Sequence, residues 1–494
     1  MQDNDIVELG FHGIAEALAQ GTTTSEEVVA AFAKRIREIE PKLNSLTWWD
    51  EAAALKEARA ADAARREGDE RPWLGIPMGI KDLLNVKGQP CTAGSRILRG
   101  YTAPYDATVI ARLREAGAIF LARTNTDEFA MGGSTETSAY GPTRNPWNLQ
   151  CVPGGSSGGS AAAVSAGLVP AALASDTGGS IRQPAAFCGV TGLKPTYGRV
   201  SRYGCVAFAS SLDQIGPMGR TVEDVAAVYG IIAGQDPHDS TTSPHEVDVS
   251  WKSLQGKTNL KGVRLGLPDE YFEEGLSPDV RKLTLEAVEV CRNLGAEIQH
   301  VKLPHSKYGI ACYYILAPAE ASANLARYDG VRYGFRGNGD SLLEMYENTR
   351  NEGFGTEVKR RILLGTHVLS SGFHDAYYRH AQKVRHLIRR DFSRVFESCD
   401  ALIGPVTPTT AFQIGEKSQT PLQMYLGDIF TVNVNLAGIC GLSVPCGFDS
   451  SGLPSGLHII GPAWEENRIL GIGAAYQHAT DWHRVSPPVA NDVA

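Results

Sequence analysis

The sequence predicts one large α/β domain with a sheet that is at least partly parallel and covered by helices. From residue 74 onward, short apolar runs bounded by glycine alternate with longer segments of helical periodicity. The alternation resumes after the polar stretch 235–260, which favours one domain over two independent ones. The chain has 494 residues, 43% of them hydrophobic and 21% charged, which is typical of a globular protein with a large core.

Residues 1–70 are predicted to form a helical cap on that domain. Thr24 and Glu27 have the spacing of a capping box, and apolar residues follow at helical intervals. We expect this helix to end at Pro41. Residues 51–67, rich in alanine and charged residues, are expected to form a second helix.

Residues 71–485 are expected to form the α/β domain itself. A strand is predicted to end near Lys81, and a helix capped by Asp106 to run to Glu115. Thr221 and Asp224 form a second capping box. The other predicted elements are a helix from Ser277 to Gly295, mainly helical chain over 311–400, strands at 118–122, 263–267, 296–303, 402–404, 442–444 and 457–460, and a flexible tail over 486–494.

Two glycine–serine turns joined by a helix of small residues are the most distinctive feature of the sequence. The first turn, 154–159, contains Ser156 and Ser157, and the second covers 176–180. Paired glycines beside a serine indicate a sharply turned chain that can direct several backbone N–H groups at one point. The candidates for such an oxyanion hole are Thr177, Gly178, Gly179 and Ser180. Two glycine loops around a packed helix are the purely structural alternative.

The base available to these serines is a lysine. No histidine occurs between Gly75 and Gln235, whereas Lys81 follows a short apolar run broken by Pro77 and Gly79. Burial lowers the pKa of an amine from about 10.4 toward neutrality. A neutral amine can take a proton from a hydroxyl, so the residues predict a relay from Lys81 through one serine to another.

Ser156 is a rival nucleophile, because the run from Gly154 to Gly158 fits the G-x-S-x-G pattern of α/β-hydrolases. Against this hypothesis, Val152-Pro153 interrupts the strand that the pattern requires, and a nearby histidine base is missing. On this reasoning Ser157 could replace either serine.

The block 75–235 resembles the amidase signature family. Lys81, Ser156 and Ser180 fall on the lysine, the bridging serine and the nucleophilic serine of that family, 75 and 24 positions apart. The resemblance implies a mixed central sheet between helices and a cis peptide bond between Gly155 and Ser156. It also implies that Ser180 attacks an amide and forms an acyl-enzyme, while Ser156 relays the proton.

Three longer runs, 127–138, 194–202 and 210–217, are similar to the glutamine-hydrolysing subunits of glutamyl-tRNA(Gln)/aspartyl-tRNA(Asn) amidotransferases. The resemblance implies that glutamine is hydrolysed in the block 75–235, with a substrate pocket in 260–485. The ammonia would convert misacylated Glu-tRNA(Gln) or Asp-tRNA(Asn). On the glutamine-binding positions of these subunits the chain has Tyr313, Arg361 and Asp428.

Arg361 has two interpretations. The resemblance implies that it pairs with the α-carboxylate of glutamine, while Asp428 accepts from the α-ammonium group. By sequence alone, Arg361 follows Lys359 and Arg360 and has the setting of a solvated helix charge.

The resemblance also implies partners: two further subunits, B and C, in a heterotrimer. ATP and magnesium would be used by one of these partners, since this chain shows neither a phosphate-binding motif nor a metal-ligand spacing. The net charge of −8 argues against a chain that binds nucleic acid by itself, so a partner is expected to hold most of the tRNA. The basic segment from Arg379 to Arg390 is interpreted as a solvated face, with a contact to a partner or tRNA as the alternative. Cys440 departs from the proline common in the motif Leu-Ala-Gly-x-Pro-Gly of these subunits.

The expected compartment is the cytoplasm. Nine cysteines without a Cys-x-x-Cys pair indicate reduced thiols, and no signal peptide or membrane span is visible. Two other functions stay open: a stand-alone amidohydrolase acting on another small amide, and a non-catalytic module whose glycine loops bind an anion.

Overall fold

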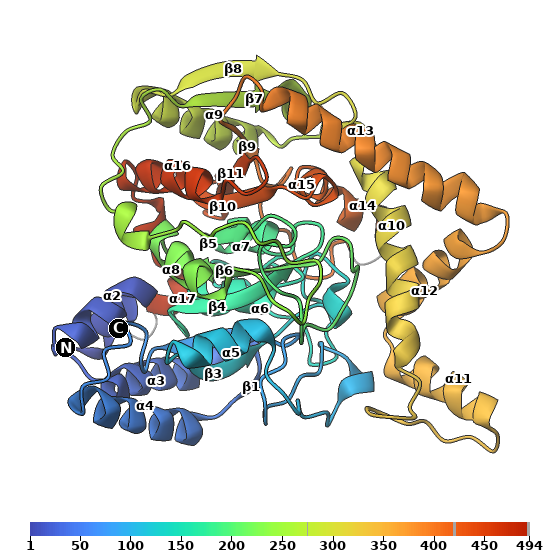
Figure 1. The fold of residues 1–494 in the computed structure, drawn as a ribbon, viewed down its shortest axis with the longest axis horizontal. Helices are drawn as coiled ribbons and strands as arrows, with labels where there is room; N and C mark the ends of the chain where they lie inside the picture. Colours follow the sequence, from blue (N-terminus) through green and yellow to red (C-terminus); the bar gives the residue numbers. More distant parts are fainter. Residues whose placement is uncertain (274, 418–420, 492–494) are drawn as a thin grey trace.

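One mixed sheet forms the centre of the computed structural model, which describes residues 1–273, 275–417 and 421–491 (Figure 1). Within those residues the sheet has eleven strands in the order β1-β3-β2-β4-β6-β5-β10-β11-β9-β7-β8. The strands are β1 (Leu46–Trp49), β2 (Pro77–Lys81), β3 (Ile119–Thr124), β4 (Ala171–Asp176), β5 (Thr191–Lys194), β6 (Gln214–Gly219), β7 (Arg264–Pro268), β8 (Glu297–Val301), β9 (Ala401–Pro405), β10 (Cys440–Phe448) and β11 (Pro454–Gly461).

Parallel pairing occurs in two separate parts of this sheet. Strand β2 is parallel to β3 and β4, and β7 is parallel to β8 and β9. The pairs β1–β3, β4–β6, β5–β6, β5–β10, β10–β11 and β9–β11 are antiparallel. The prediction of a mixed sheet is therefore confirmed.

Helices cover both faces of the sheet. Strand β10 shows this directly, because successive side chains of a strand point to opposite faces. Arg182 of α7 lies against Gly441, whereas Gly473 of α16 lies against Leu442 and Val444. The helices are α1 (Asp3–Glu8), α2 (Gly10–Ala19), α3 (Ser25–Leu43), α4 (Glu51–Arg66), α5 (Thr108–Glu115), α6 (Gly158–Ser165), α7 (Arg182–Cys188), α8 (Val222–Ile232), α9 (Pro278–Asn293), α10 (Gly309–Asn324), α11 (Leu342–Gly353), α12 (Thr356–Leu369), α13 (Arg379–Val395), α14 (Pro421–Leu426), α15 (Val432–Ala437), α16 (Glu466–His478) and α17 (Pro488–Asn491).

The apolar interior consists mainly of two clusters. The larger one joins the N-terminal helices to the sheet and includes Ile80 and Ile181. The second lies among α10, α12, α13 and α15 and includes Tyr313 and Val432. The second glycine–serine turn lies where the clusters meet, since a Cβ atom on Gly178 would come within 2.8 Å of the ring of Tyr313.

The N-terminal segment differs from its prediction in two respects. The capping box is confirmed, because the side chain of Thr24 accepts from the N–H of Glu27. The expected helix end at Pro41 is wrong: α3 continues to Leu43, and Asn44 adopts the left-handed conformation with φ 53°. A proline in the last turn removes one late hydrogen bond, and its fixed φ is itself helical. The segment also contributes β1 to the sheet, so it is more than a cap.

Two further expectations are corrected. Asp106 does not cap α5, whose N-cap is Ala107; its carboxylate accepts instead from the N–H of Lys87 and from Arg114. The predicted tail is ordered over 488–491, where α17 forms and Val489 and Ala490 are buried. Residues 492–494 of that predicted tail lie outside the described residues.

Two smaller findings complete the fold. All nine cysteines are free thiols, and eight of them are buried. In the part of the chain that the structure describes, no helix combines the length and apolar character needed to cross a membrane.

Candidate active site

Lys81, the last residue of β2, lies in a fully buried pocket of hydroxyl groups. Its Nζ is 2.8 Å from the Oγ atoms of both Ser156 and Ser157 and 3.0 Å from that of Ser175. We call these four residues the hydroxyl cluster. Among the described residues no carboxylate lies within ion-pair distance of Lys81. Burial lowers the pKa of Lys81 to about 7, with Asp127 opposing this shift from a distance. The lysine can therefore lose its proton near neutral pH.

The first glycine turn brings Ser156 to this lysine. The peptide bond between Gly155 and Ser156 is cis, as the resemblance implied. The N–H of Gly155 donates to the side-chain oxygen of Gln183 at 2.8 Å. Only glycine fits at this position, since a Cβ atom would lie 2.2 Å from the carboxylate of Asp127.

Asp127 packs against the same turn. It was assigned no role in the sequence analysis. Its buried carboxylate accepts from the N–H groups of Ser134 and Thr135 and from the hydroxyl of Thr137. These bonds fold the segment 127–138 around the turn. The sequence did contain one indication of this role, because Asp127 is the first residue of the run 127–138 that is similar to the amidotransferase subunits.

The turn that carries Ser180 is held by a buried ion pair between Asp176 and Arg182. One carboxylate oxygen of Asp176 accepts from the N–H of Gly179 at 2.8 Å, and the other from that of Ile181 at 3.1 Å. Arg182 donates to both oxygens at 3.0 Å. Although burial raises the pKa of Asp176, the guanidinium of Arg182 outweighs it and holds the pKa well below its usual range. A charged carboxylate therefore fixes the shape of the turn.

This arrangement engages one of the four N–H groups predicted for the oxyanion hole. The N–H of Gly179 is engaged by Asp176, and the hydroxyl of Thr177 donates to Asp213 at 2.7 Å. The backbone N–H groups of Thr177, Gly178 and Ser180 donate to no acceptor among the described residues. Three of the four candidate donors thus stay available to a substrate oxygen.

The two serines of the predicted relay lie on adjacent backbones but do not touch through their hydroxyls. The N–H of Ser157 donates to the carbonyl of Ser180 at 3.3 Å, which places the turns side by side. No hydrogen bond joins the Oγ atoms of Ser156 and Ser180 in the described structure, so that predicted contact is absent. Ser180 makes no side-chain hydrogen bond to the described residues and keeps 8% of its surface exposed. Rotation about χ1 would therefore break no side-chain hydrogen bond of Ser180 among the described residues.

Arg361 is buried, 3% exposed, and not a solvated helix charge. Its guanidinium carbon lies 5.2 Å from the ring centre of Tyr314 and 5.5 Å from that of Tyr425. Its Nε donates to Glu357 at 2.8 Å, and the hydroxyl of Tyr425 donates to the same oxygen at 2.8 Å. Burial alone would lower the pKa of Arg361, but Tyr314 and Glu357 reverse this and raise it. The arginine therefore stays cationic inside the protein.

Asp428 completes this second group. Asp428 is half-buried, and the hydroxyl of Tyr314 donates to its carboxylate at 3.5 Å. Burial raises the pKa of Asp428 to about 7, although Arg361 works in the opposite direction. We call Tyr314, Glu357, Arg361, Tyr425 and Asp428 the distal cluster. Tyr313, the third predicted pocket residue, is also buried and links the two groups, because its ring borders Gly178.

A cavity of about 320 Å³ opens beside the distal cluster. Glu357, Arg361 and Tyr425 line it, together with residues 132–134, which lie next to the first glycine turn. The cavity thus adjoins both the distal cluster and the segment that supports the turn of Ser156. Glu357, Tyr314 and Tyr425 were missed by the sequence analysis, since they come together only in the folded chain.

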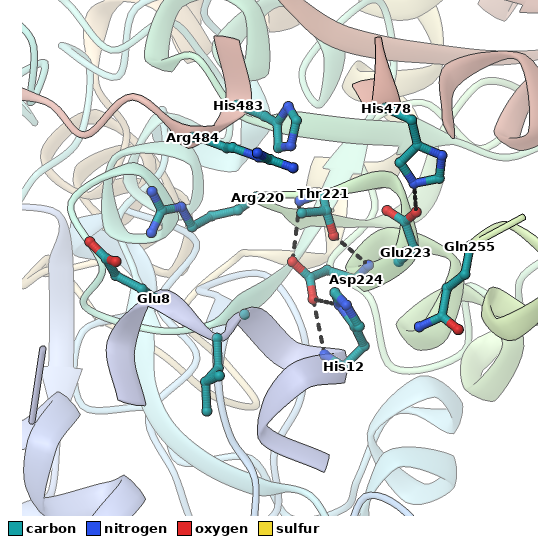
Figure 2. A pocket seen from close by; sticks show the side chains of 12 residues that line it. Glu8, His12, Arg220, Thr221, Glu223, Asp224, Gln255, His478, His483 and Arg484 are labelled. Atoms are coloured by element: carbon teal, nitrogen blue, oxygen red, sulfur yellow. Dashed lines mark hydrogen bonds and ion pairs between the residues drawn. The ribbon is translucent and has the colours of Figure 1, made fainter. Parts of the chain in front are cut away.

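A separate hollow of about 550 Å³ lies among α2, α8 and the end of α16 (Figure 2). Its polar side chains largely satisfy one another. His12 pairs with Asp224 at 2.8 Å, and His478 pairs with Glu223 at 2.9 Å. The first pair joins α2 to α8 and the second joins α16 to α8, and neither contains a residue predicted to be functional. Within the described residues, no group of three or more histidine, cysteine, aspartate or glutamate side chains could hold a metal ion.

The fold and the two serine turns together are those of an amidase. The family model described as Amidase matches residues 27–470. The chain therefore belongs to this family, which is the amidase signature family that the block 75–235 resembles.

Within the amidase family, the chain is most informatively compared with amidotransferase subunits. The chain is 56% identical over 477 residues to the A subunit of glutamyl-tRNA(Gln) amidotransferase from Roseiflexus castenholzii, covering 97% of both chains. It is 54% identical over 485 residues to the protein of the same name from Methylacidiphilum infernorum, covering 98% of this chain and 97% of the other. The crystal structure of the corresponding protein from Thermotoga maritima superposes with a TM-score of 0.77 at 40% identity, covering 97% of this chain and 94% of that one. A 6-aminohexanoate cyclic dimer hydrolase has a similar fold, with a TM-score of 0.85 at 25% identity, covering 98% and 100% of the two chains.

Proposed function

We propose that this chain is the glutamine-hydrolysing subunit of a tRNA-dependent amidotransferase. The observation that carries the proposal is the buried cation of Arg361 near the half-buried carboxylate of Asp428, which Thr431 links to the turn of Ser180. A cation and a carboxylate at one end of a pocket suit the α-carboxylate and α-ammonium groups of an amino acid. An apolar amide would offer no cation to Asp428, which has none within ion-pair distance among the described residues, and no second carboxylate to Arg361, which pairs with Glu357 alone. Relatives that share more than half of the sequence over nearly the full length support the same assignment.

In the proposed mechanism the distal cluster orients glutamine. Arg361 pairs with its α-carboxylate, and Asp428 accepts from its α-ammonium group. Tyr313 lies between this end of the pocket and Gly178, so it borders the substrate side chain. The side-chain amide carbon then faces Ser180.

The hydroxyl cluster activates the nucleophile. On substrate binding Ser180 rotates its hydroxyl toward Ser156, and the neutral amine of Lys81 takes the proton of Ser156 as Ser156 takes that of Ser180. The Oγ of Ser180 bonds to the amide carbon, and the N–H groups of Thr177, Gly178 and Ser180 stabilise the oxyanion. The C–N bond then breaks, and the leaving nitrogen receives the proton through Ser156 and departs as ammonia.

Water completes the cycle. It attacks the glutamyl ester on Ser180 while its proton passes through Ser156 to Lys81. The ester C–O bond then breaks, the proton returns through Ser156 to the Oγ of Ser180, and glutamate is released. The charged pair of Asp176 and Arg182 plays no direct part in bond making. It holds the turn in which three N–H groups stay unoccupied.

The proposal includes the rest of the assembly. Two further subunits, B and C, form a heterotrimer with this chain, and a partner uses ATP and magnesium to activate misacylated Glu-tRNA(Gln) or Asp-tRNA(Asn). That partner also holds most of the tRNA. The assembly works in the cytoplasm.

Trapping of the acyl-enzyme tests the proposal. The protein is mixed with glutamine, quenched in acid within one turnover and digested, and mass spectrometry then locates any glutamyl adduct. We expect the adduct on Ser180 and none in a Ser180→Ala variant. An adduct on Ser156 instead would support the rival nucleophile, and turnover of glutamine by Ser180→Ala would refute the mechanism.

A further inference from the structure

Helix α13 carries a single-sign stripe of exposed charge. Figure 1 shows the helix along the outer edge of the molecule, leading away from the end of the sheet that holds β7 and β8. Its exposed basic residues recur at steps of four, three, four and four residues, so they share one face. The buried Ala381, Ile388 and Phe392 occupy the opposite face. We call the exposed set the α13 stripe: Arg379, Lys383, His386, Arg390 and Arg394.

The stripe is almost unpaired within the described chain. Arg379 lies 3.4 Å from Asp375, and no other member is within ion-pair distance of a described carboxylate. The single acid on α13, Asp391, is buried and accepts from the N–H of His305 instead. Solvated helix faces typically mix charges of both signs, and like charges four residues apart destabilise a helix. An anion from outside the chain would relieve this repulsion.

A groove of about 640 Å³ borders the stripe and extends its positive character. It lies between α13 and the turns 436–439 and 462–464, and no aspartate or glutamate among the described residues lines it. His386 and the exposed Arg389 form part of its wall. Arg385, by contrast, is fully occupied inside the fold, where it donates to Leu436 and Ser211.

The kind of anion follows from what this face lacks. No large apolar side chain of α13 is exposed among the described residues, whereas protein interfaces depend on buried aromatic and apolar anchors. The arginine and lysine residues of the stripe are spaced by about 6 to 10.5 Å along the helix axis. Such a row of charges can pair with a polymer backbone that carries one negative charge per unit, without contacts to the groups attached to that backbone. Phosphate contacts of this kind position nucleic acids without reading their sequence.

We propose that the α13 stripe binds the phosphodiester backbone of the tRNA substrate. The inference rests on the proposed function, which supplies a tRNA as the ligand. The net charge of −8 opposes binding over the whole surface, but a local stripe is sufficient for one segment of a bound tRNA. The stripe would add to the contacts that a partner makes with the tRNA and leave glutamine hydrolysis unchanged.

Binding of labelled, unfractionated tRNA to the full-length chain tests this proposal by fluorescence anisotropy across a range of salt concentrations. The test variant replaces Arg379, Lys383, Arg390 and Arg394 with glutamine. We expect its affinity at about 50 mM salt to fall at least tenfold, and the slope of log K against log salt to become shallower by about three. The matched control makes the same change of charge at four exposed cations elsewhere: Lys56, Arg66, Lys257 and Lys282. It should bind as the wild type does.

Three outcomes would overturn the proposal. The first is tRNA binding by the wild type that does not depend on salt concentration. The second is an equal loss of tRNA affinity in the test and control variants. The third is displacement of tRNA by polyglutamate at equal charge concentration. The last result would assign the stripe to an acidic protein segment. Ammonia release from glutamine is measured in parallel and should be the same in both variants. A wild type that binds tRNA through the stripe but hydrolyses no glutamine would refute the proposed function and leave this inference standing.

Discussion

The hydroxyl cluster and the distal cluster each contain a buried cation, and burial by itself lowers the pKa of both, yet the net pKa shifts are opposite. Lys81 has three hydroxyl partners and no carboxylate within ion-pair distance in the described structure, so its pKa falls to about 7. Arg361 has Glu357 and the faces of aromatic rings, so its pKa rises despite the loss of water. The partners of a buried cation, and not burial itself, therefore decide whether it becomes a base or a fixed charge.

Replacing Lys81 with methionine tests the base side of this comparison and has the largest expected effect. The change keeps the size of the side chain and removes the only amine of the hydroxyl cluster. Because general-base catalysis contributes about 10² to 10⁴, we expect kcat for glutamine hydrolysis to fall about 10³-fold. Ammonia release in a coupled assay measures this.

Lys194 provides a matched control, since it is also buried and donates to the carbonyl of Pro195 at 2.7 Å. Lys194→Met should change kcat by less than about tenfold. Equal losses in the two variants would mean that burying any lysine matters, and that Lys81 has no special role.

Single alanine substitutions at Ser156 and Ser157 separate the two hydroxyls that Lys81 contacts at the same distance. Distance cannot distinguish them, but the hydroxyl of Ser157 donates to the carbonyl of Ser175 at 3.0 Å and is committed to the fold. We expect Ser156→Ala to lower kcat at least about 10²-fold and Ser157→Ala by less than about tenfold. Stopped-flow acylation rates measure both. The reverse order would transfer the relay to Ser157.

The two clusters also differ in how far the sequence predicted them. The position of Lys81 and the turns of Ser156 and Ser180 follow from local signals, an apolar run and paired glycines. The engagement of Gly179 by Asp176 could not be predicted, because it depends on how one carboxylate is oriented by a buried arginine. The same holds for the free hydroxyl of Ser180.

Arg361 was predicted to be solvated on sequence alone, although a signal for its burial was present. Val358, Gly365 and Val368 are buried on α12, and Arg361 lies on the same face at helical spacing. The charged residues Lys359 and Arg360 directly before it made the whole segment look solvent-exposed. Tyr425 gave no such signal, since only the tertiary fold brings it to Glu357.

Arg361→Gln tests the fixed charge of the distal cluster. A hydrogen bond to a charged group contributes about 1.5 to 3 kcal/mol, so KM for glutamine should rise about 10- to 100-fold while kcat changes less. Arg360→Gln is the control, because Arg360 also pairs with Glu357 but is largely exposed. It should shift KM by less than about threefold. An unchanged KM in Arg361→Gln would favour a different amide as substrate.

The pH profile compares the two clusters in one experiment. Lys81 must be neutral and Asp428 charged, and each condition is met only above its pKa of about 7. Activity is therefore lost as pH falls, and log kcat/KM should decline with a slope approaching two below about pH 6. Bound glutamine places an ammonium group beside Asp428 and lowers its pKa, so the slope of log kcat should approach one. In Asp428→Asn the slope of kcat/KM should also approach one, and a wild-type slope of one would show that only one of the two groups matters.

Tyr425→Phe should have the smallest effect and tests how Arg361 is held. The change removes the hydroxyl that donates to Glu357 at 2.8 Å and keeps the ring stacked on Tyr314 at 3.8 Å between centres. One hydrogen bond contributes about 1 kcal/mol, so KM should rise about fivefold with kcat unchanged. Tyr425→Ala, which also removes the ring, should raise KM further. If the two variants behave alike in steady-state kinetics, the hydroxyl rather than the ring orients Arg361. If Tyr425→Phe changes kcat instead, Tyr425 acts on the serine turns, and the separation of the two clusters does not hold.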